Sequence, residues 1–377
     1  MDLPETPRIK SQFKPLVYAP DACQLRSHLG SVTIREEWGE GFLEHLIPLL
    51  DGHHTVEEIL GALEEFDESL VIQTLRELAA SGVIVQGKEA GTSAGLGEKE
   101  PRFDGQMAAF SNFSQEDGAD FQRRLADSRV VILGLGVIGA RILRGLSRCG
   151  VGDLVGIDAK RVTSREIYTD SWYDEDDEGD ERTTVLAKKI RQAGPNVRFT
   201  PVQVEDLATA EPRVEIESAD LVVLAFYEMR PDVYMAVNRW CLDTETKWTS
   251  CRLNGFEFNI GPTVIPYETP CYKCYELRKK SNLTSFEDYK VFEEYASEHG
   301  FVWDFLNVIP GCDLAALEVI KLLTSFTDPA TYGHVVSLNL LTMESRTDTV
   351  LKLPRCPHCG KPAQEKPRVK NWQQARD

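Results

Sequence analysis

The sequence lacks three features that would each place the chain in a definite class of protein. No run approaches the roughly 20 consecutive apolar residues that a membrane-spanning helix needs, so we expect neither a membrane segment nor a membrane partner. The N-terminus MDLPETPRIK has no apolar stretch like that of a signal peptide, which favours a cytoplasmic protein. Positive charge is scarce, because 42 Lys and Arg face 60 Asp and Glu for a net charge of −18. Such a chain repels polyanions, so we do not expect nucleic acid as a partner.

Residues 1–88 combine short strand patterns with helical patterns. The expected elements are strands at 16–18, 23–26 and 31–35, helices at 42–50, after Thr55 and at 68–80, and a closing strand at 83–85. Thr55 and Glu58 have the spacing of a helix capping box. Three strands followed by three helices predict a small winged-helix-like domain. Residues 89–101 are rich in Gly, Ala, Ser and charge, which predicts a linker.

Residues 102–377 show the alternation of strands and helices that is typical of a doubly wound α/β domain. The expected elements are strands at 130–133, 154–157, 198–202, 221–226, 335–341 and 349–353, a helix from the glycine-rich turn to Cys149, and a helix at 184–192. The alternation of strands and helices predicts a mainly parallel, Rossmann-like sheet.

A glycine motif follows the first of these strands. Gly134, Gly136 and Gly139 have the GxGxxG spacing, and the next strand ends at Asp158. In a dinucleotide fold, such glycines permit a tight turn, close approach of a phosphate and close packing of helix on strand, while the aspartate accepts a ribose hydroxyl. The motif predicts the fold. The motif alone leaves open whether a nucleotide binds, because the glycines could serve helix–strand packing alone.

Four of the nine cysteines form two CxxC pairs, at Cys271–Cys274 and Cys356–Cys359. Four thiolates close a tetrahedral shell around zinc and leave no open position, so the pattern predicts a structural zinc site. An odd number of cysteines argues against a complete disulfide framework. The remaining cysteines lie in apolar or helical contexts and are expected to be small buried hydrophobic residues.

The glycine-rich first strand, the GVG before the second strand and the paired CxxC motifs resemble the ubiquitin-activating-type (ThiF-like) adenylating superfamily over about residues 102–360. Members with a full site use ATP and Mg²⁺ to adenylate a C-terminal carboxylate. This sequence departs from the family pattern at several positions. Gly105 and Thr169 stand at family arginines, Lys160 at the second aspartate of a DxD motif, Arg182 at the catalytic lysine, and Tyr227 or Glu228 at the magnesium-binding aspartate.

These departures bear on whether ATP binds. ATP carries about four negative charges, which cations and Mg²⁺ must neutralise during attack. Two arginine positions are uncharged here, and seven of the eight residues at 174–181 are carboxylates. We therefore expect a vestigial nucleotide site with no ATP and no catalytic residue. Its residues would be Gly134, Gly136, Gly139, Asp158 and Arg182.

Residues 8–85 resemble the RiPP recognition element, a winged-helix-like domain that binds the leader of a ribosomally made peptide. The stretches LLDGHHTVEEIL and LRELAASGVIV carry this resemblance. An extended leader would add a strand to an exposed sheet edge. The expected contacts are Ser31, Val32, Thr33, Ile34 and Arg35 on the edge strand, and Ile72, Leu75 and Arg76 on the last helix. A DNA-binding winged helix is disfavoured, because residues 1–88 carry 7 Lys and Arg against 15 Asp and Glu.

Together, the two halves resemble the leader-binding component of azole/azoline peptide (TOMM) cyclodehydratase systems. The resemblance implies a scaffold that presents a precursor peptide to a separate YcaO-type, ATP-dependent cyclodehydratase in antibiotic biosynthesis. Related domains commonly form homodimers. The alternative is an active enzyme that adenylates a peptide carboxylate with ATP. A third hypothesis, an NAD-dependent oxidoreductase, leaves the CxxC pairs unexplained.

Overall fold

The computed structural model of the chain describes residues 3–10, 13–19, 22–27, 30–35, 41–87, 101–114, 116, 118–169, 171–193, 197–299, 301–302 and 307–360. Most of the expected linker, residues 88–100, lies outside these ranges. The chain divides into two compact units, Met1–Arg124 and Leu125–Asp377. No helix in the described ranges is long and apolar enough to cross a membrane.

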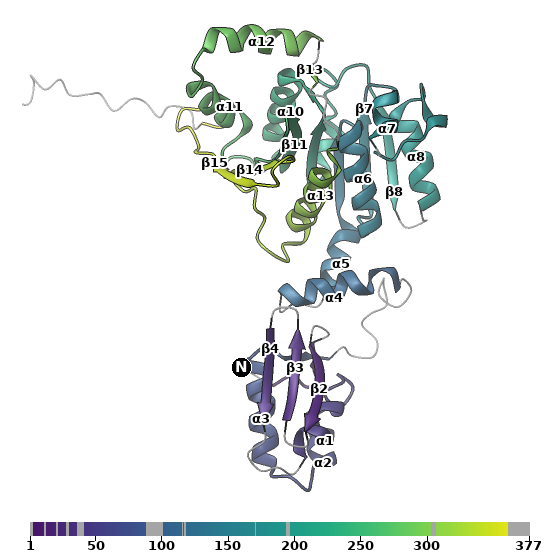
Figure 1. Cartoon of the computed structure of the whole chain (residues 1–377), viewed down its shortest axis with the longest axis vertical. Helices are drawn as coiled ribbons and strands as arrows, with labels where there is room; N and C mark the ends of the chain where they lie inside the picture. Colours follow the sequence, from purple (N-terminus) through teal and green to yellow (C-terminus); the bar gives the residue numbers. More distant parts are fainter. Residues whose placement is uncertain are drawn as a thin grey trace, which may run out of the picture. The chain divides into compact units, whose positions relative to one another are not determined.

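The first unit contains a two-stranded and a three-stranded antiparallel sheet together with short helices (Figure 1). Its strands are β1 (Pro7–Ile9), β2 (Lys14–Ala19), β3 (Ala22–Ser27), β4 (Gly30–Arg35) and β5 (Ile84–Gln86). Its helices are α1 (Phe42–Leu49), α2 (Val56–Ala62), α3 (Glu68–Ala80), a 3-10 turn η1 (Pro101–Phe103), α4 (Asp104–Phe113) and α5 (Gly118–Asp127), the last of which crosses into the second unit.

Local sequence signals set several of these elements. Thr55 caps α2 through its side chain, which accepts a hydrogen bond from the Glu58 backbone N–H at 3.2 Å, while Glu58 accepts one from the Thr55 backbone N–H at 2.8 Å. This confirms the expected capping box. Asp67 caps α3 with its side chain, which accepts a hydrogen bond from the Ser69 backbone N–H at 2.7 Å. Val71 and Leu78 of α3 are buried in the core of this unit, as their helical spacing predicts.

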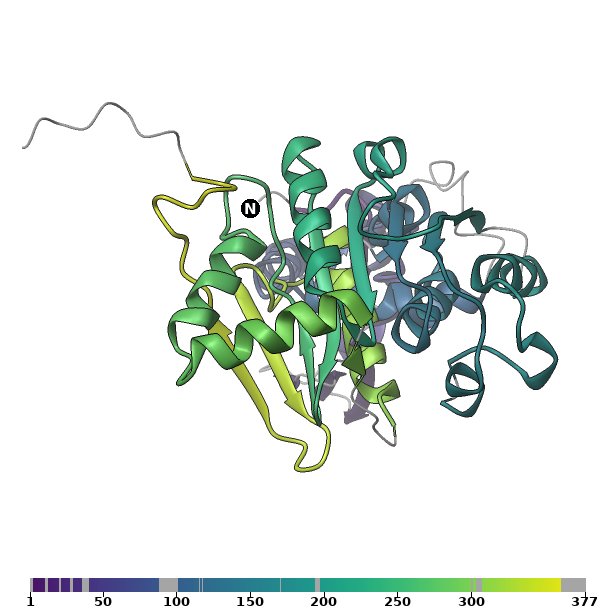
Figure 2. The same ribbon diagram turned by 90° about the horizontal axis from the view of Figure 1, so that it is seen from above.

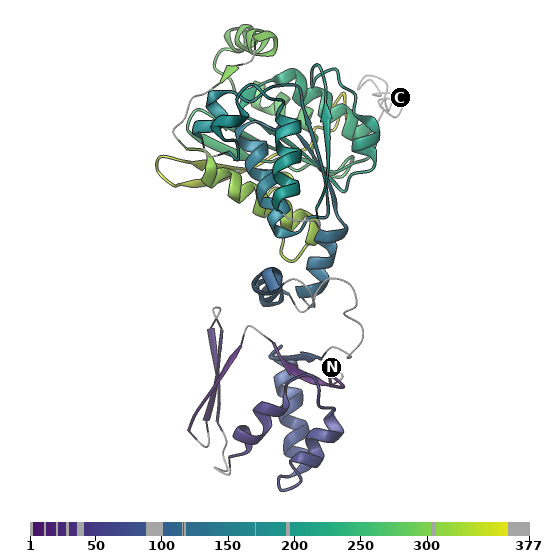
Figure 3. The ribbon, with the colours of Figure 1, turned by 90° about the vertical axis from the view of Figure 1, so that its right-hand side faces the viewer.

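The three-stranded sheet has the order β2–β3–β4, so among the described residues β4 is an edge strand that pairs with β3 alone. The sheet stands beside the helices (Figure 3), and Cys23 and Leu25 of its central strand enter the core. β1 pairs instead with β5, with Arg8 opposite Val85. The strands and helices expected from the sequence are present, and the winged-helix assignment of this unit stays a prediction.

The second unit is built on an eight-stranded sheet with the order β15–β14–β12–β11–β9–β6–β7–β8. Its strands are β6 (Arg129–Leu133), β7 (Asp153–Asp158), β8 (Arg198–Gln203), β9 (Leu221–Phe226), β11 (Trp248–Asn254), β12 (Glu257–Ile260), β14 (His334–Asn339) and β15 (Ser345–Thr349), with β10 (Glu228–Met229) and β13 (Phe301–Val302) forming a separate pair. The strands from β11 to β8 are parallel, and β12, β14 and β15 extend the sheet in antiparallel fashion.

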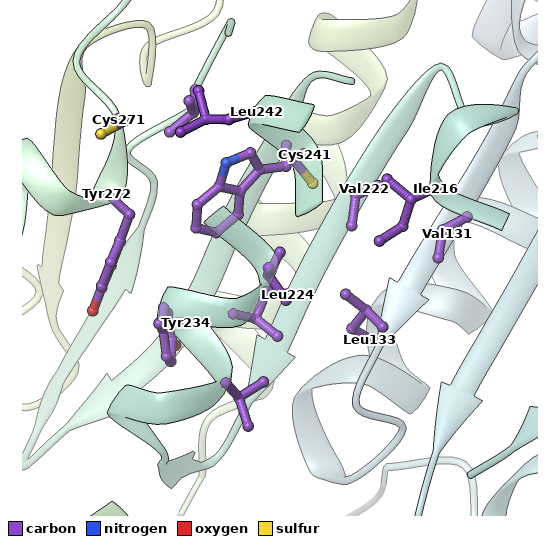
Figure 4. Close-up of a cluster of buried hydrophobic side chains, with 14 of the residues drawn as sticks. Val131, Leu133, Ile216, Val222, Leu224, Tyr234, Cys241, Leu242, Cys271 and Tyr272 are labelled. Carbon is purple, nitrogen blue, oxygen red and sulfur yellow. The ribbon is translucent and has the colours of Figure 1, made fainter. Parts of the chain in front are cut away.

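Helices cover both faces of this sheet (Figure 2). They are α6 (Val137–Cys149), α7 (Ser164–Tyr168), a 3-10 turn η2 (Glu175–Asp177), α8 (Arg182–Ala193), α9 (Arg213–Glu217), α10 (Pro231–Asp243), α11 (Tyr272–Ser281), α12 (Phe286–His299) and α13 (Ile309–Thr324). On one face, Leu133 and Leu224 of the central strands pack with Tyr234 and Cys241 of α10 and with Tyr272 of α11 (Figure 4). The parallel, Rossmann-like half of the sheet confirms the expected α/β class.

The antiparallel half differs from the sequence-based expectation. We expected a last strand at 349–353, whereas β15 runs from Ser345 to Thr349. The turn after β14 explains the difference, because the Asn339 backbone N–H donates to the carbonyl of Glu344 at 2.9 Å. This bond closes a hairpin and fixes the register of β15. The residues of β15 are exposed, so apolar patterning carries no signal for it.

Candidate functional site

The glycine motif forms the turn between β6 and α6. Gly134 adopts a φ of 88°, which favours glycine, and an added Cβ there would lie 2.7 Å from the carbonyl oxygen of Ala225. An added Cβ at Gly139 would lie 1.8 Å from the carbonyl oxygen of Gly134. Both positions therefore require glycine for the close packing of turn, helix and neighbouring strand, whether or not a nucleotide binds.

Gly136 lines the pocket at this edge of the sheet and has protein side chains close by. An added Cβ at Gly136 would meet the Arg182 guanidinium at 3.4 Å and a Glu166 carboxylate oxygen at 3.7 Å. In a dinucleotide site, the missing side chain at this glycine lets a phosphate approach the backbone. Here side chains of the chain itself lie next to it.

Asp158 connects three parts of the site. Its Oδ2 accepts from the Leu135 backbone N–H at 2.5 Å, and its Oδ1 accepts from the Lys160 backbone N–H at 2.7 Å. Arg182 Nη1 also donates to Oδ2, at 3.3 Å. Asp158 is 1% exposed. The carboxylate thus joins the glycine turn to the end of β7 and to the start of α8, and a ribose would find little of it accessible.

Arg182 lies between two buried carboxylates. Its Nη2 donates to Glu166 Oε1 at 2.6 Å, in addition to its bond with Asp158. Burial lowers the pKa of Arg182, and the two carboxylates raise it by more, so the net direction is upward. Glu166 also caps α7 by accepting from the Thr163 backbone N–H at 2.9 Å. Arg182, which we expected at the position of the family's catalytic lysine, is thus paired with two carboxylates of the chain itself.

A pocket lies beside this cluster, and its empty space of about 700 Å³ is open to solvent. Lys160 Nζ donates to Glu228 at 2.7 Å across it, and Arg230 donates to Asp206 at 3.0 Å and to its helix neighbour Asp232 at 2.7 Å. Three of the four basic side chains that line the pocket (Lys160, Arg182 and Arg230, with Arg165 the fourth) are thus bound to carboxylates. Asp158, Glu166, Glu205, Asp206 and Glu228 supply the negative charge of the lining.

The structure refines three positions of the family pattern. Glu228 lines the pocket and supplies a carboxylate near the expected metal position, while Tyr227 lies beside it. Thr169 ends α7, and its hydroxyl donates to the carbonyl of Arg165 at 2.8 Å. Arg165, four residues before Thr169, lines the pocket, and the sequence analysis did not name it. Arg165 and Thr169 lie about one helical turn apart along α7.

The acidic run at 174–181 does not line this pocket. Most of its residues are exposed, and Lys189 binds Asp177 at 2.7 Å and also binds Asp174. The run behaves as a solvated loop whose carboxylates pair with Lys189 and, at Glu181, with Arg161. The run therefore repels a nucleotide in the pocket only weakly. The pairing of Lys160, Arg182 and Arg230 with carboxylates opposes nucleotide binding more strongly.

The four cysteines of the CxxC pairs converge in the second unit. All four are buried, and their sulfur atoms lie within 4.8 Å of one another. The Sγ–Sγ distances are 3.6 Å for Cys271–Cys356, 3.6 Å for Cys274–Cys359 and 3.9 Å for Cys271–Cys274. Four sulfurs bound to one zinc at about 2.3 Å lie about 3.8 Å apart, so the arrangement fits a tetrahedral zinc site.

Groups around the cluster orient its ligands. The Leu353 backbone N–H donates to Cys274 Sγ at 3.4 Å. Asn238 of α10 accepts from the Tyr272 backbone N–H at 2.8 Å, and its Nδ2 lies 3.0 Å from Nδ1 of His358. One buried asparagine thereby holds both CxxC segments, which are far apart in the sequence. Zinc would join the start of α11 to the segment at 356–359 and would serve structure rather than catalysis, because four protein ligands leave no open position.

Burial makes the isolated core thiols unreactive. It raises the pKa of Cys251 to about 12 and that of Cys312 well above its usual value. Both are fully buried. They fit the expected role of small hydrophobic residues.

The expected peptide contacts divide into two groups. Ser31, Val32, Thr33 and Arg35 of β4 are exposed and Ile34 is half-buried, while Arg76 of α3 is exposed and Ile72 is half-buried. Leu75 is 0% exposed and belongs to the hydrophobic core, so its proposed contact with a peptide was wrong. Leu75 continues the apolar stripe of Val71 and Leu78 along α3, and this stripe packs into the core.

The similarity to known protein sequences lies mostly in the second unit. A sequence model described as the ThiF family matches residues 103–360. The molybdopterin-synthase adenylyltransferase of Escherichia coli is 28% identical over 250 residues, covering 64% of this chain and 92% of the relative. The sulfur carrier protein ThiS adenylyltransferase of the same organism is 25% identical over 241 residues, covering 64% and 89%.

Among solved structures, E. coli MccB with AMPCPP and MccA is similar over 94% of this chain and 99% of that chain, with a TM-score of 0.69 and 16% identity. A structure of PaaA is similar over 79% and 97%, with a TM-score of 0.62 and 20% identity. At these identities the likeness establishes a shared fold. The match to MccB extends beyond the second unit.

Proposed function

The chain belongs to the ThiF family, and from that premise we propose that it is a leader-peptide-binding scaffold. It holds a ribosomal precursor peptide and presents it to a separate YcaO-type, ATP-dependent cyclodehydratase that forms azolines from Cys, Ser or Thr. Holding the leader raises the effective concentration of the core peptide at the partner's active site. The observation that carries the proposal is the exposed strand β4, which lies at a sheet edge among the described residues of the first unit.

The pairing of the sheet indicates which backbone groups of β4 are open. Pro15 of β2 lies opposite Leu25 of β3 and has no N–H to donate, so the backbone groups of Leu25 are expected to face β4. Leu25 lies opposite Val32. By alternation, the N–H and C=O groups of Ser31, Thr33 and Arg35 then point to the free edge. An extended leader would bond to these groups and place side chains near Ile72 and Arg76.

The nucleotide pocket supports the same division of labour. Most of its cations are bound by the chain's own carboxylates, and Asp158 is almost inaccessible. A triphosphate would have to break these pairs before it gained new ones, and the Arg182–Asp158 pair among them is buried. If the partner cyclodehydratase binds and uses ATP, this pocket does not have to bind ATP. The likeness to the fold of MccB, which has been solved with MccA bound, is consistent with peptide binding.

Thr33→Pro tests the proposal. It removes one outward N–H and should leave the β3–β4 ladder intact. Val17→Pro is the matched control, since Val17 lies opposite Cys23 on the other edge strand. We expect Thr33→Pro to weaken binding of the precursor's leader, measured by fluorescence anisotropy, by at least ten-fold, and Val17→Pro to leave it unchanged. Equal cyclodehydration by the YcaO partner with and without this chain would refute the scaffold.

A second candidate function is ATP-dependent adenylation of a peptide carboxylate. It is favoured by the curated relatives, which are named as adenylyltransferases, and by the intact glycine turn with Asp158 and Glu228 at the pocket. Calorimetric titration with Mg²⁺–ATP and an ATP–pyrophosphate exchange assay decide between the two functions. Micromolar ATP binding with peptide-dependent exchange would make adenylation the primary function.

A further inference from the structure

The two edges of the eight-stranded sheet in the second unit differ. The sheet ends in β8 on one side and in β15 on the other. β8 contains Pro201, which has no N–H to offer to a further strand. β15 contains no proline, and all five of its residues are exposed. Among the described residues β15 pairs with β14 alone (Figure 1). Its second edge is therefore open to pairing with another chain.

Two hydrogen bonds orient the backbone of β15. The Asn339 N–H donates to the Glu344 carbonyl at 2.9 Å before the strand, and the Val350 N–H donates to the Gly333 carbonyl at 2.8 Å after it. The backbone groups of Glu344 and Val350 thus face β14. Backbone groups alternate in direction along an antiparallel strand, so the other even-numbered residues face β14 as well. The N–H and C=O groups of the odd-numbered residues then point to the free edge, and these residues are Ser345, Thr347 and Thr349.

The charges on β15 are self-complementary. Arg346 and Asp348 flank Thr347, and their side chains are 64% and 51% exposed. If two copies of β15 pair in antiparallel fashion about Thr347, Arg346 of each copy lies opposite Asp348 of the other. These are non-hydrogen-bonded positions, because their own backbone groups face β14, and such positions bring opposite side chains closest together. Registers centred on Arg346 or on Asp348 would instead place like charges opposite each other.

Exposed apolar side chains lie just beyond both ends of the strand. Met343 is 86% and Leu351 58% exposed, and each is four residues from Thr347. Antiparallel pairing about Thr347 therefore brings Met343 of one copy to Leu351 of the other. Their contact would stabilise the pair, because apolar area would be removed from water. The charges and the apolar ends thus favour the same register independently of each other.

We propose that two copies of this chain pair edge to edge through β15, in antiparallel register about Thr347. The open backbone groups of the odd-numbered residues exchange hydrogen bonds across a twofold axis. Within one chain Arg346 Nε already lies 2.9 Å from Asp348 Oδ2, so pairing joins two such ion pairs into a network of four charges. The contact is closed, since both copies use the same edge, and it joins the two sheets into one. The inference does not depend on the proposed leader binding.

Charge reversal followed by mixing tests the pairing. Arg346→Asp gives β15 two carboxylates, and Asp348→Arg gives it two arginines. Each variant alone should self-associate at least about ten-fold more weakly than the parent, because like charges then lie opposite each other. An equimolar mixture of the two variants should recover the affinity of the parent, since opposite charges meet again. Sedimentation velocity of the full-length chain over a concentration series measures the dissociation constant.

Two further variants separate this contact from a general effect of charge. Arg123→Asp is the matched control, because Arg123 forms an exposed ion pair with Asp120 in the first unit. It changes the net charge by the same amount as Arg346→Asp and should leave self-association unchanged. Thr347→Pro removes an outward N–H at the twofold axis and should weaken the pairing without any change of charge. An unchanged melting temperature confirms that each variant is folded.

The outcomes are distinct. Loss of self-association in each charge variant and its recovery on mixing would support pairing through β15. Loss that mixing does not recover would contradict the register about Thr347. A parent chain that stays monomeric at its highest soluble concentration would overturn the proposal. A dimer whose dissociation constant none of the β15 variants alters would also overturn it, because that dimer uses another surface.

Discussion

Replacing Arg182 by methionine separates a structural role of this residue from a nucleotide-binding role. The side chain is buried and lies between Asp158 and Glu166, with N–O distances of 3.3 and 2.6 Å. Methionine fills much of the same volume and removes the charge. Two nearly inaccessible carboxylates then lose their shared cation.

The expected cost is large. Removing one partner from a buried ion pair destabilises a protein by about 3–5 kcal/mol, because the remaining charge stays buried without compensation. Asp158 is 1% and Glu166 4% exposed, so water replaces the guanidinium poorly. Arg161→Met is the matched control, because Arg161 pairs with Glu181 at 3.8 Å on the surface. Such an exposed pair contributes about 0–1 kcal/mol.

Urea unfolding followed by tryptophan fluorescence measures the difference, since Trp248 is buried in the second unit. Arg182→Met should lower the midpoint markedly, and Arg161→Met should barely change it. The triple variant Asp158→Asn, Glu166→Gln, Arg182→Met should recover most of the loss, because neutral groups replace all three charges. If Arg182→Met keeps the stability of the parent and abolishes Mg²⁺–ATP binding, Arg182 is a nucleotide ligand and our reasoning about the pocket is refuted.

Three further outcomes follow from the zinc cluster and from Lys279. Cys356→Ser should abolish binding of one zinc per chain, measured by mass spectrometry of the metal, and lower the melting temperature, whereas Cys149→Ser should change neither. Asn238→Ala should weaken zinc affinity about 10–100-fold in a competition titration with a chelator, because it removes the group that orients both CxxC segments. Lys279 should acylate faster than Lys280 between pH 8 and 10, since burial lowers its pKa to about 8 and leaves it largely neutral there while an ordinary lysine is still protonated. A pH profile of labelling that is the same for both lysines would contradict the buried environment of Lys279.

The amino-acid sequence alone determined the elements whose signals are local. Thr55 and Glu58 specify a helix start because the capping box is formed within four residues. The glycine motif specifies a strand–turn–helix unit because Gly134 and Gly139 exclude side chains where backbone atoms meet. The two CxxC pairs predict that the four cysteines lie close together, because this spacing is typical of a single zinc site with four thiolate ligands.

Tertiary structure decided the features that depend on distant partners. Leu75 and Ile72 belong to one helix, and only packing assigns the first to the core and leaves the second half-buried. The pairing of Arg182 with Glu166 and the meeting of Arg252 with Tyr272 and Tyr275 join separate elements, so no local pattern announces them. Whether a family residue keeps its role is therefore a question of which charges lie beside it, and that arrangement exists only in the folded chain.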